Sequence, residues 1–319
     1  MIACVFPGQG AQYVGMGVDL ASRHAVARRV FDDASAAIGL DMLTLCREGP
    51  EERLRDTAYT QPAILTCSWA AAAVLAEAGV VVGCTAGLSL GEYTALVLSG
   101  ALAFPDAVAV VRQRGQFMHE AARGRDTAMA AVVGLPAARV VEICAAVPGF
   151  VEAANFNAPG QVVIAGDVEP VREASTRLRT AGARRVIPLA VSAPFHTSLM
   201  RPAADRLAAV LAAVEVREAR LPVVANVSAA VVRTPEEIRR ALVEQVASPV
   251  RWEESVRTLW DLGADVFIEV GPGTTLAGLI KKTVPEARVV SAENQATLEQ
   301  ALSIARVQGP SSRRDTLVP

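Results

Sequence analysis

Hydrophobic positions follow two spacings along the chain, and their alternation predicts an α/β protein. Short apolar runs such as "IACVF" and "DVFIEV" are typical of buried parallel strands. Longer segments between them carry apolar residues at helical spacing. We expect helices at residues 25–38, 61–78, 105–122, 198–214, 235–247, 251–262 and 274–283, and one more that begins near Leu90. Residues 1–122 and 192–306 are expected to form one α/β body with a parallel sheet.

The middle of the chain, residues 123–191, follows a different order. Its pattern reads strand, helix, strand, strand, helix, strand, which is the βαββαβ order of a ferredoxin-like unit. Because such a unit closes on itself, we expect a small domain inserted into the body, with a ligand cleft between the two. The last residues, 307–319, are polar and aperiodic and are expected to form a disordered tail.

Composition narrows the function classes. Hydrophobic residues make up 52% of the 319 residues and charged residues 20%, which indicates a folded globular protein. The net charge is −2 and the basic residues are scattered, so we expect no nucleic acid or membrane partner. The five cysteines stand apart in apolar runs, which predicts buried thiols, no bound metal and a reducing compartment. The strand-like start, without a basic leader, predicts a cytoplasmic protein.

The sequence "GLSLG" at residues 87–91 fits a G-x-S-x-G pattern. A strand before it and a helix after it are the context of a nucleophile elbow, in which Ser89 projects its hydroxyl from a tight turn. The alternative is a helix cap, in which Ser89 and Glu92 form an S-x-x-E capping box. The pattern alone leaves both interpretations open.

A nucleophilic serine needs a base, and the chain offers three histidines. His24 lies in a polar stretch and is expected to be a solvated surface group. His119 lies on an amphipathic helix, where a surface position is also expected. His196 follows the inserted unit, in a loop at the domain junction, and is therefore the candidate base.

A placed cation could hold an anionic substrate, and Arg112 and Arg114 share one predicted helix. Gly115 weakens that helix by about 1 kcal/mol, which suggests that another segment approaches its backbone closely there and favours Arg114. The loop "FPGQGAQ" lacks the spacing of a dinucleotide fingerprint or a P-loop, so we expect neither cofactor.

Eight motifs in order, from residue 6 to residue 282, carry a resemblance to a known family. They are "FPGQGAQYVGMG", "TQPAILT", "GLSLGEYTALVLSGAL", "RGQFMHEA", "NFNAPGQVVIAG", "SAPFHTSLM", "SPVRWEESV" and "IEVGPGTTLAGLIKK". Together they resemble the malonyl-CoA:acyl carrier protein transacylases and the related acyltransferases of polyketide synthesis.

This resemblance implies an α/β-hydrolase-like body with a ferredoxin-like insert. It also implies that Ser89 is the acylated nucleophile, that His196 is its base and that the N–H groups of Gln9 and Leu90 form the oxyanion hole. Arg114 would bind the free carboxylate of the malonyl group in a bidentate pair. The malonyl group would pass from malonyl-CoA to the phosphopantetheine thiol of an acyl carrier protein, with ping-pong kinetics and no bound cofactor. We expect a monomer that serves fatty acid or polyketide biosynthesis.

The resemblance also covers residues around this centre. Asn157 matches a family asparagine near the site, and a backbone carbonyl in the 249–251 loop is expected to orient His196. Phe195 matches a position where phenylalanine accompanies malonyl over methylmalonyl selection, because a large ring leaves little room for a branch. Two residues depart from the family pattern: Leu88 stands where most relatives carry histidine, and Arg251 where many carry glutamine.

Three other functions stay open at this point. One is a hydrolase that releases acyl groups from carrier proteins, although such relatives lack the carboxylate-binding arginine. The second is an acyltransferase for a different extender unit in polyketide synthesis. The third is a non-catalytic module that docks a carrier protein.

Overall fold

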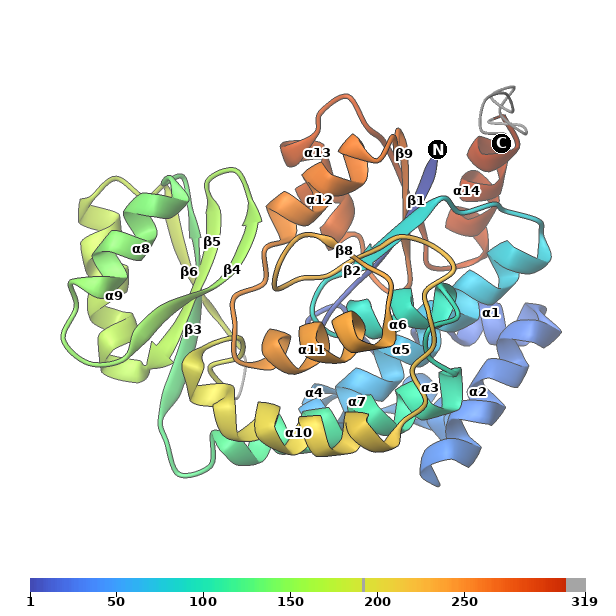
Figure 1. Ribbon diagram of the computed structural model, residues 1–319, viewed down its shortest axis with the longest axis horizontal. Helices are drawn as coiled ribbons and strands as arrows, with labels where there is room; N and C mark the ends of the chain where they lie inside the picture. The colour runs from blue at the N-terminus through green and yellow to red at the C-terminus, as the bar shows by residue number, and fades with distance from the viewer. Residues whose placement is uncertain (191–192, 308–319) are drawn as a thin grey trace.

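The computed structural model describes residues 1–190 and 193–307 and shows a mixed α/β protein with two separate sheets (Figure 1). The larger sheet has the order β10-β9-β1-β2-β7-β8, in which β8 pairs antiparallel and all other neighbours pair parallel. Its strands are β1 (Ile2–Phe6), β2 (Cys84–Gly87), β7 (Val223–Val224), β8 (Val231–Val232), β9 (Val266–Val270) and β10 (Arg288–Ala292). The expected α/β class with a parallel sheet is therefore confirmed.

Helices cover both faces of this sheet, as a buried parallel sheet requires. They are α1 (Val18–Arg23), α2 (Ala25–Ile38), α3 (Met42–Glu48), α4 (Glu51–Arg55), α5 (Thr57–Glu77), α6 (Gly91–Leu98), α7 (Phe104–Ala121), α10 (Arg201–Ala213), α11 (Pro235–Val246), α12 (Trp252–Asp261), α13 (Thr275–Thr283) and α14 (Gln295–Val307), with a 3-10 turn at Ser198–Met200. Along β1, Cys4 and Phe6 point into the core shared with α2, α5 and α7, whereas Ala3 and Val5 point to the core under α12 and α13. This period of two explains the continuous apolar run of "IACVF".

The smaller sheet belongs to the inserted segment and is antiparallel, with the order β4-β5-β3-β6. Its elements are β3 (Thr127–Val133), α8 (Ala137–Ala145), β4 (Val151–Ala158), β5 (Gln161–Asp167), α9 (Val168–Thr180) and β6 (Arg185–Leu189). Ala130 and Val132 pack in the core under α8 and α9. Met129 and Ala131, one residue out of step, instead line a pocket that the insert shares with the body.

The carboxyl ends of the parallel strands place the loops that matter for function. β1, β2, β7 and β9 run in the same direction, so the segments that follow them emerge at one edge of the sheet. These segments include the loop after Phe6, the turn at 88–90, the turn at 225–230 and the turn at 271–274. Such an edge is where α/β sheets present their ligand sites.

Several elements differ from the prediction. The strand expected over 222–227 pairs only at Val223–Val224, and α5 begins four residues earlier than expected. β10 and α14 were not predicted, because the short run "RVVSA" carries two polar residues and α14 has only a narrow apolar stripe. α14 ends at residue 307, and the remainder of the expected tail, 308–319, lies outside the described residues.

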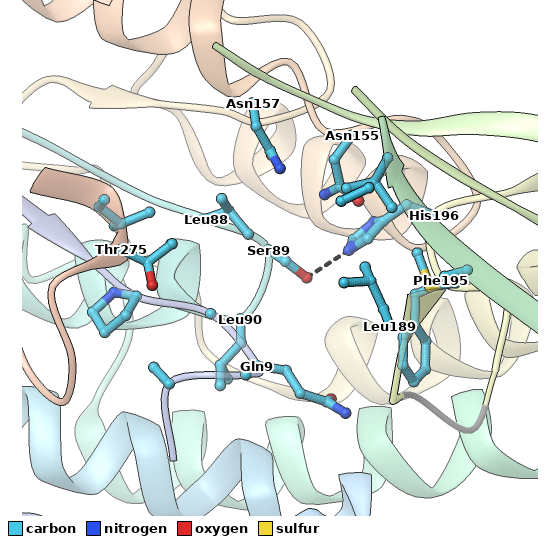
Figure 2. Close-up of a pocket in the computed structure, with 18 of the residues that line it drawn as sticks. Gln9, Leu88, Ser89, Leu90, Asn155, Asn157, Leu189, Phe195, His196 and Thr275 are labelled. Atoms are coloured by element: carbon cyan, nitrogen blue, oxygen red, sulfur yellow. Dashed lines mark hydrogen bonds between the residues drawn. The ribbon is translucent and has the colours of Figure 1, made fainter. Parts of the chain in front are cut away.

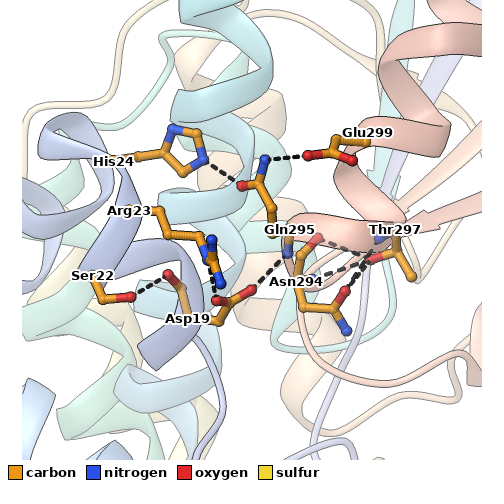
Figure 3. Close-up of polar contacts among 8 residues, drawn as sticks. All are labelled: Asp19, Ser22, Arg23, His24, Asn294, Gln295, Thr297 and Glu299. Carbon is orange, nitrogen blue, oxygen red and sulfur yellow. Dashed lines mark hydrogen bonds and ion pairs between the residues drawn. The ribbon is translucent and has the colours of Figure 1, made fainter.

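The C-terminal helix α14 is held against the N-terminal helices by polar contacts (Figure 3). The backbone N–H of Gln295 donates to Asp19 at 2.9 Å, and its side-chain oxygen lies 2.7 Å from Nε2 of His24. Asn294 caps the helix start by accepting the N–H of Thr297 at 3.1 Å. The prediction that His24 is a solvated surface group is therefore wrong: its ring is half-buried and bonded to α14.

Other sequence expectations are confirmed. All five cysteines are buried and none forms a disulfide. His119 is exposed. At Gly115 an added Cβ would lie 2.5 Å from the carbonyl oxygen of Thr57, so the start of α5 does approach the α7 backbone there. No helix within the described part of the chain is long and apolar enough to span a membrane.

Candidate active site

Ser89 lies in a sharp turn between β2 and α6. Its φ is 52°, a left-handed conformation that non-glycine residues rarely adopt. The flanking glycines are needed for space: a Cβ at Gly87 would lie 1.9 Å from the carbonyl carbon of Gly91, and one at Gly91 would lie 2.1 Å from the carbonyl oxygen of Phe6. The strained serine and the two crowded glycines are the geometry of a nucleophile elbow.

The capping-box alternative for Ser89 is wrong. No side chain caps α6, and the carboxylate of Glu92 does not bond to the backbone of Ser89. It instead accepts the N–H of Asn226 at 2.9 Å and the side-chain amide of Gln245 at 2.7 Å. The Ser89 hydroxyl therefore stays free to face the pocket and its histidine.

The structure brings His196, the candidate base, to Ser89. Its Nε2 lies 2.6 Å from Oγ of Ser89, as Figure 2 shows, and its Nδ1 lies 2.9 Å from the backbone carbonyl oxygen of Gln245. Because a carbonyl can only accept, Nδ1 carries the proton and Nε2 is free to accept the serine proton. The orienting carbonyl was expected in the 249–251 loop, but it belongs to Gln245, because the last turn of α11 reaches the imidazole before the chain enters that loop.

The electrostatic surroundings keep His196 neutral. Burial is the larger cause and the positive charge of Arg114 the second, and together they lower the pKa of His196 to about 4. The ring is only 3% exposed. At neutral pH the imidazole is therefore ready to accept a proton.

Arg114, on α7, reaches the same centre although it is only 2% exposed. One terminal nitrogen donates to Oγ of Ser89 at 3.1 Å and to the side-chain oxygen of Gln245 at 2.9 Å. The other donates to the side-chain oxygen of Gln61 at 2.8 Å, and the guanidinium lies 5.6 Å from the ring centre of Tyr93. No carboxylate of the described residues forms an ion pair with it. The nearest buried carboxylate, that of Glu92, attracts Arg114 electrostatically but is separated from it by the side chain of Gln245. A buried cation beside a nucleophile, with no direct carboxylate contact, is suited to an anionic substrate group.

Arg112 lies elsewhere. Its guanidinium donates to the backbone carbonyl of Ile38 at 2.5 Å and so ties α7 to α2. The structure therefore separates the two arginines that the sequence placed on one helix, and only Arg114 faces Ser89.

Two backbone N–H groups at the pocket have no acceptor within the described residues. Gln9 and Leu90 both line the pocket, and within the described chain neither N–H donates to another protein group. Leu90 precedes the first turn of α6, where the helix dipole favours negative charge. A Cβ at Gly8 would lie 2.6 Å from the carbonyl oxygen of Leu88, so the loop after β1 lies directly against the elbow.

The pocket around Ser89 has a volume of about 290 Å³ and lies between body and insert. In Figure 2, Leu88 and Thr275 lie on one side of Ser89, and Phe195 and Leu189 on the other. From the insert it is lined by Met129, Ala131, Asn155, Asn157, Gln161, Val163 and Leu189. The body thus supplies the charged and nucleophilic groups of the pocket, whereas the insert supplies apolar side chains together with the amides of Asn155, Asn157 and Gln161.

The remaining predicted residues also line this pocket or its edge. Phe195 and Asn157 both line it, and the side-chain oxygen of Asn157 is buried without a hydrogen-bond partner. Leu88 is half-buried and packs on the core under α12 and α13. The side chain of Arg251 forms an ion pair with Glu254 on the surface and does not reach the site.

Sequence reasoning missed four buried polar residues of this centre: Gln61, Glu92, Asn226 and Gln245. Glu92 was considered only as a helix cap, and Asn226 only as part of a strand. Gln61 stands in a quoted motif, so its presence there was the available signal. Nothing in the pattern distinguished Gln245 from an ordinary helix glutamine.

Comparisons with known proteins agree with this geometry. Residues 3–308 match the model of a family described as acyl transferase domain. The malonyl CoA-acyl carrier protein transacylase of Bacillus subtilis is 44% identical over 304 residues, which cover 94% of this chain and 96% of that protein.

Solved structures are equally similar. The acyl-carrier-protein S-malonyltransferase of Burkholderia pseudomallei superposes with a TM-score of 0.92 at 44% identity and covers 95% of this chain and 99% of that one. A malonyl-transacylase solved in complex with its type II polyketide acyl carrier protein gives a TM-score of 0.93 at 42% identity, with 95% and 99% covered. With the family model matching almost the whole chain and close relatives spanning it, this chain belongs to the acyl transferase family.

Proposed function

We propose that this protein transfers a malonyl group from malonyl-CoA to the phosphopantetheine thiol of an acyl carrier protein, through an acyl intermediate on Ser89. The observation that carries the proposal is the buried guanidinium of Arg114, which contacts no carboxylate directly and lies 3.1 Å from the Ser89 hydroxyl that also faces His196. The names of the similar proteins describe the same transfer. The Ser–His pair supplies acyl transfer chemistry, and Arg114 supplies the preference for an acyl group that ends in a carboxylate.

In the first half-reaction, Oγ of Ser89 attacks the thioester carbonyl of malonyl-CoA while Nε2 of His196 takes the hydroxyl proton. The carbonyl oxygen becomes an oxyanion that the N–H groups of Gln9 and Leu90 stabilise. When the intermediate collapses, the C–S bond breaks and His196 returns the proton to the departing CoA sulfur. The product is malonyl-Ser89 and free CoA.

In the second half-reaction, the phosphopantetheine thiol gives its proton to His196 and attacks the ester carbonyl of malonyl-Ser89. The same two N–H groups hold the oxyanion, the C–O bond to Ser89 breaks, and the serine regains its proton. The Gln245 carbonyl holds the imidazole in the required tautomer through both steps. Because CoA leaves before the carrier enters, the kinetics are ping-pong.

The acyl group is selected at two points. The malonyl carboxylate pairs with the guanidinium of Arg114, whose planar geometry suits two parallel hydrogen bonds. The ring of Phe195, 8% exposed in the pocket wall, leaves little room for a branch on the α-carbon. We therefore propose malonyl over methylmalonyl selection. Asn157 is proposed to contact the substrate arm, because its buried oxygen has no protein partner.

The proposal extends to the organisation of the chain. Residues 1–122 plus 192–306 would form an α/β-hydrolase-like catalytic body, and residues 123–191 a ferredoxin-like insert. The strand order β4-β5-β3-β6 and the βαββαβ succession support the insert assignment. We also propose that the protein is a cytoplasmic monomer. Because Ser89, His196 and Arg114 supply the nucleophile, the base and the cation, we propose that it needs no bound cofactor.

Intact-protein mass spectrometry after mixing with malonyl-CoA tests the proposal. Wild type should gain the mass of one malonyl group, and Ser89→Ala should gain none and lose transfer by at least about 10⁴-fold. Absence of the malonyl-enzyme in wild type would contradict the proposal. Counting products separates transfer from hydrolysis: malonyl-carrier should exceed free malonate, and an excess of malonate would favour the hydrolase.

A further inference from the structure

Asn226, in the turn after β7, is fully buried against the Ser89 elbow. Its side-chain oxygen accepts the backbone N–H of Ser89 at 2.5 Å, and its side-chain nitrogen donates to the backbone carbonyl of Gly87 at 2.7 Å. One side-chain amide thus bonds to the backbone on both sides of Leu88. No other side chain in the described residues bonds to the elbow backbone at both of these points.

The side-chain amide of Asn226 extends the hydrogen bonding of the sheet beyond the end of β7. β2 and β7 pair parallel only at Thr85 and Ala86, and the ladder ends there. Beyond that point the primary amide of Asn226 offers one acceptor and one donor, as a peptide group of a neighbouring strand would. It thereby bonds to the chain after β2 as far as Ser89, the residue with the strained backbone.

Non-glycine residues with a positive φ, a strained backbone conformation, lie around this contact. Ser89, His196 and Ala229 are the non-glycine residues with positive φ in the described part of the chain. The first two form the proposed catalytic pair, and the third bends the turn that carries Asn226. Such conformations persist only where the surroundings hold them in place.

Asn226 is itself held by a buried carboxylate. Its backbone N–H donates to Glu92 at 2.9 Å, and the same oxygen of Glu92 accepts the side-chain amide of Gln245 at 2.7 Å. Gln245 in turn donates to the carbonyl of Ser89 at 3.1 Å. Both sides of the elbow are therefore bonded to one network, and all four polar groups of Asn226 are used, since its carbonyl accepts the N–H of Arg251 at 3.0 Å.

We propose that Asn226 is a positioning residue for acyl transfer: its side-chain amide replaces a strand neighbour and holds Ser89 in the left-handed conformation from which Oγ reaches His196. The amide also occupies the N–H of Ser89, so that the oxyanion is left to the N–H groups of Leu90 and Gln9. This inference rests on the proposed function. It concerns the rate of Ser89 acylation and leaves recognition of the carboxylate by Arg114 unchanged.

The test compares Asn226→Ala and Asn226→Asp with wild type in rapid-mixing acylation by malonyl-CoA. Asp keeps the shape and the acceptor for Ser89 but presents an oxygen to the Gly87 carbonyl, so it tests the site if the Ala variant does not fold. Both variants should acylate about tenfold to a hundredfold more slowly, as expected for a displaced nucleophile, with KM within about twofold of wild type.

Asn294→Ala is the matched control, because it removes an asparagine cap at α14 that does not line the pocket, and it should lower stability without slowing acylation (Figure 3). If Asn226 variants acylate within threefold of wild type, if only KM rises, or if Asn294→Ala slows acylation equally, the positioning role is overturned. Wild type that is never acylated would instead overturn the proposed function, so the two failures are distinguishable.

Discussion

The two sides of the pocket are built differently. The body side presents Ser89 and Arg114, which buried hydrogen bonds hold in place, and the N–H groups of Gln9 and Leu90, all at or near the carboxyl edge of the parallel sheet. The insert side presents uncharged residues, four apolar and three with amide side chains, from one face of an antiparallel sheet. Chemistry therefore depends on fixed polar contacts in the body, whereas the insert shapes the space for the acyl group.

The largest expected effect comes from removing the cation on the body side. Arg114→Ala should lower kcat/KM for malonyl-CoA by about 10²-fold or more, because a desolvated ion pair with the substrate is lost. Uncharged acyl groups such as acetyl should be spared. The measurement is acyl-enzyme formation with both thioesters, and equal loss for both would refute the salt bridge.

The matched control for this variant lies on the same helix. Arg112→Ala also removes a guanidinium from α7, but that group only bonds to the carbonyl of Ile38. It should change stability without changing the preference for malonyl over acetyl. A shift in preference in this control would show that α7 packing, and not the placed charge, sets selectivity.

A smaller effect is expected at Phe195, which lines the pocket from the body side, just after the insert ends. Phe195→Ser should raise the methylmalonyl to malonyl ratio of Ser89 acylation by about tenfold, because one added methyl group is worth about 1–3 kcal/mol in a tight pocket. Competition between the two thioesters, read by mass spectrometry, measures the ratio. Comparable acylation of wild type by both would show that Phe195 does not discriminate.

The smallest effect concerns pH. Acylation needs neutral His196, whose pKa burial and Arg114 lower to about 4. A group with a lowered pKa stays unprotonated until pH falls through that value, so protonation of His196 should lower kcat/KM only below about pH 5. Any fall between pH 8 and pH 5 is assigned to Glu92, whose pKa burial raises to about 7. In Arg114→Ala the acid limb should move upward only in part, because burial is the larger cause. An acid limb near the ordinary histidine value of 6.5 that persists in Glu92→Gln would contradict the buried environment of His196.

On the body side, the sequence predicted which residues meet at the site, but not the backbone and amide contacts that hold them there. Ser89 stood in a pattern with its own spacing, and His196 was one of three histidines, so few alternatives competed. Arg114 was distinguished from Arg112 by Gly115, because a close helix contact at α5 requires a glycine. These residues could be found because their chemistry restricts the residue type.

Gln245 and Asn226 could not be found in that way. Gln245 acts through its backbone carbonyl, which bonds to His196, and Asn226 through its side-chain amide, which bonds to the backbone of the elbow. Such contacts exist only after distant segments have packed. The orienting carbonyl was misplaced by a few residues for the same reason, since any residue type supplies a carbonyl. The β10 strand and α14 were missed because their patterns are short or weakly apolar, and tertiary contacts decide their structure.

The central position of β1 has a consequence for synthesis of the protein. β1 pairs with β2 on one side, but its other neighbour, β9, begins at Val266. A ribosome that extends the chain from its N-terminus therefore leaves one edge of the innermost strand unpaired until more than four-fifths of the 319 residues have been made. Gln245, which orients His196, is also synthesised well after Ser89 and Arg114. The nascent chain consequently completes its acyl transfer centre only after these late segments have been made.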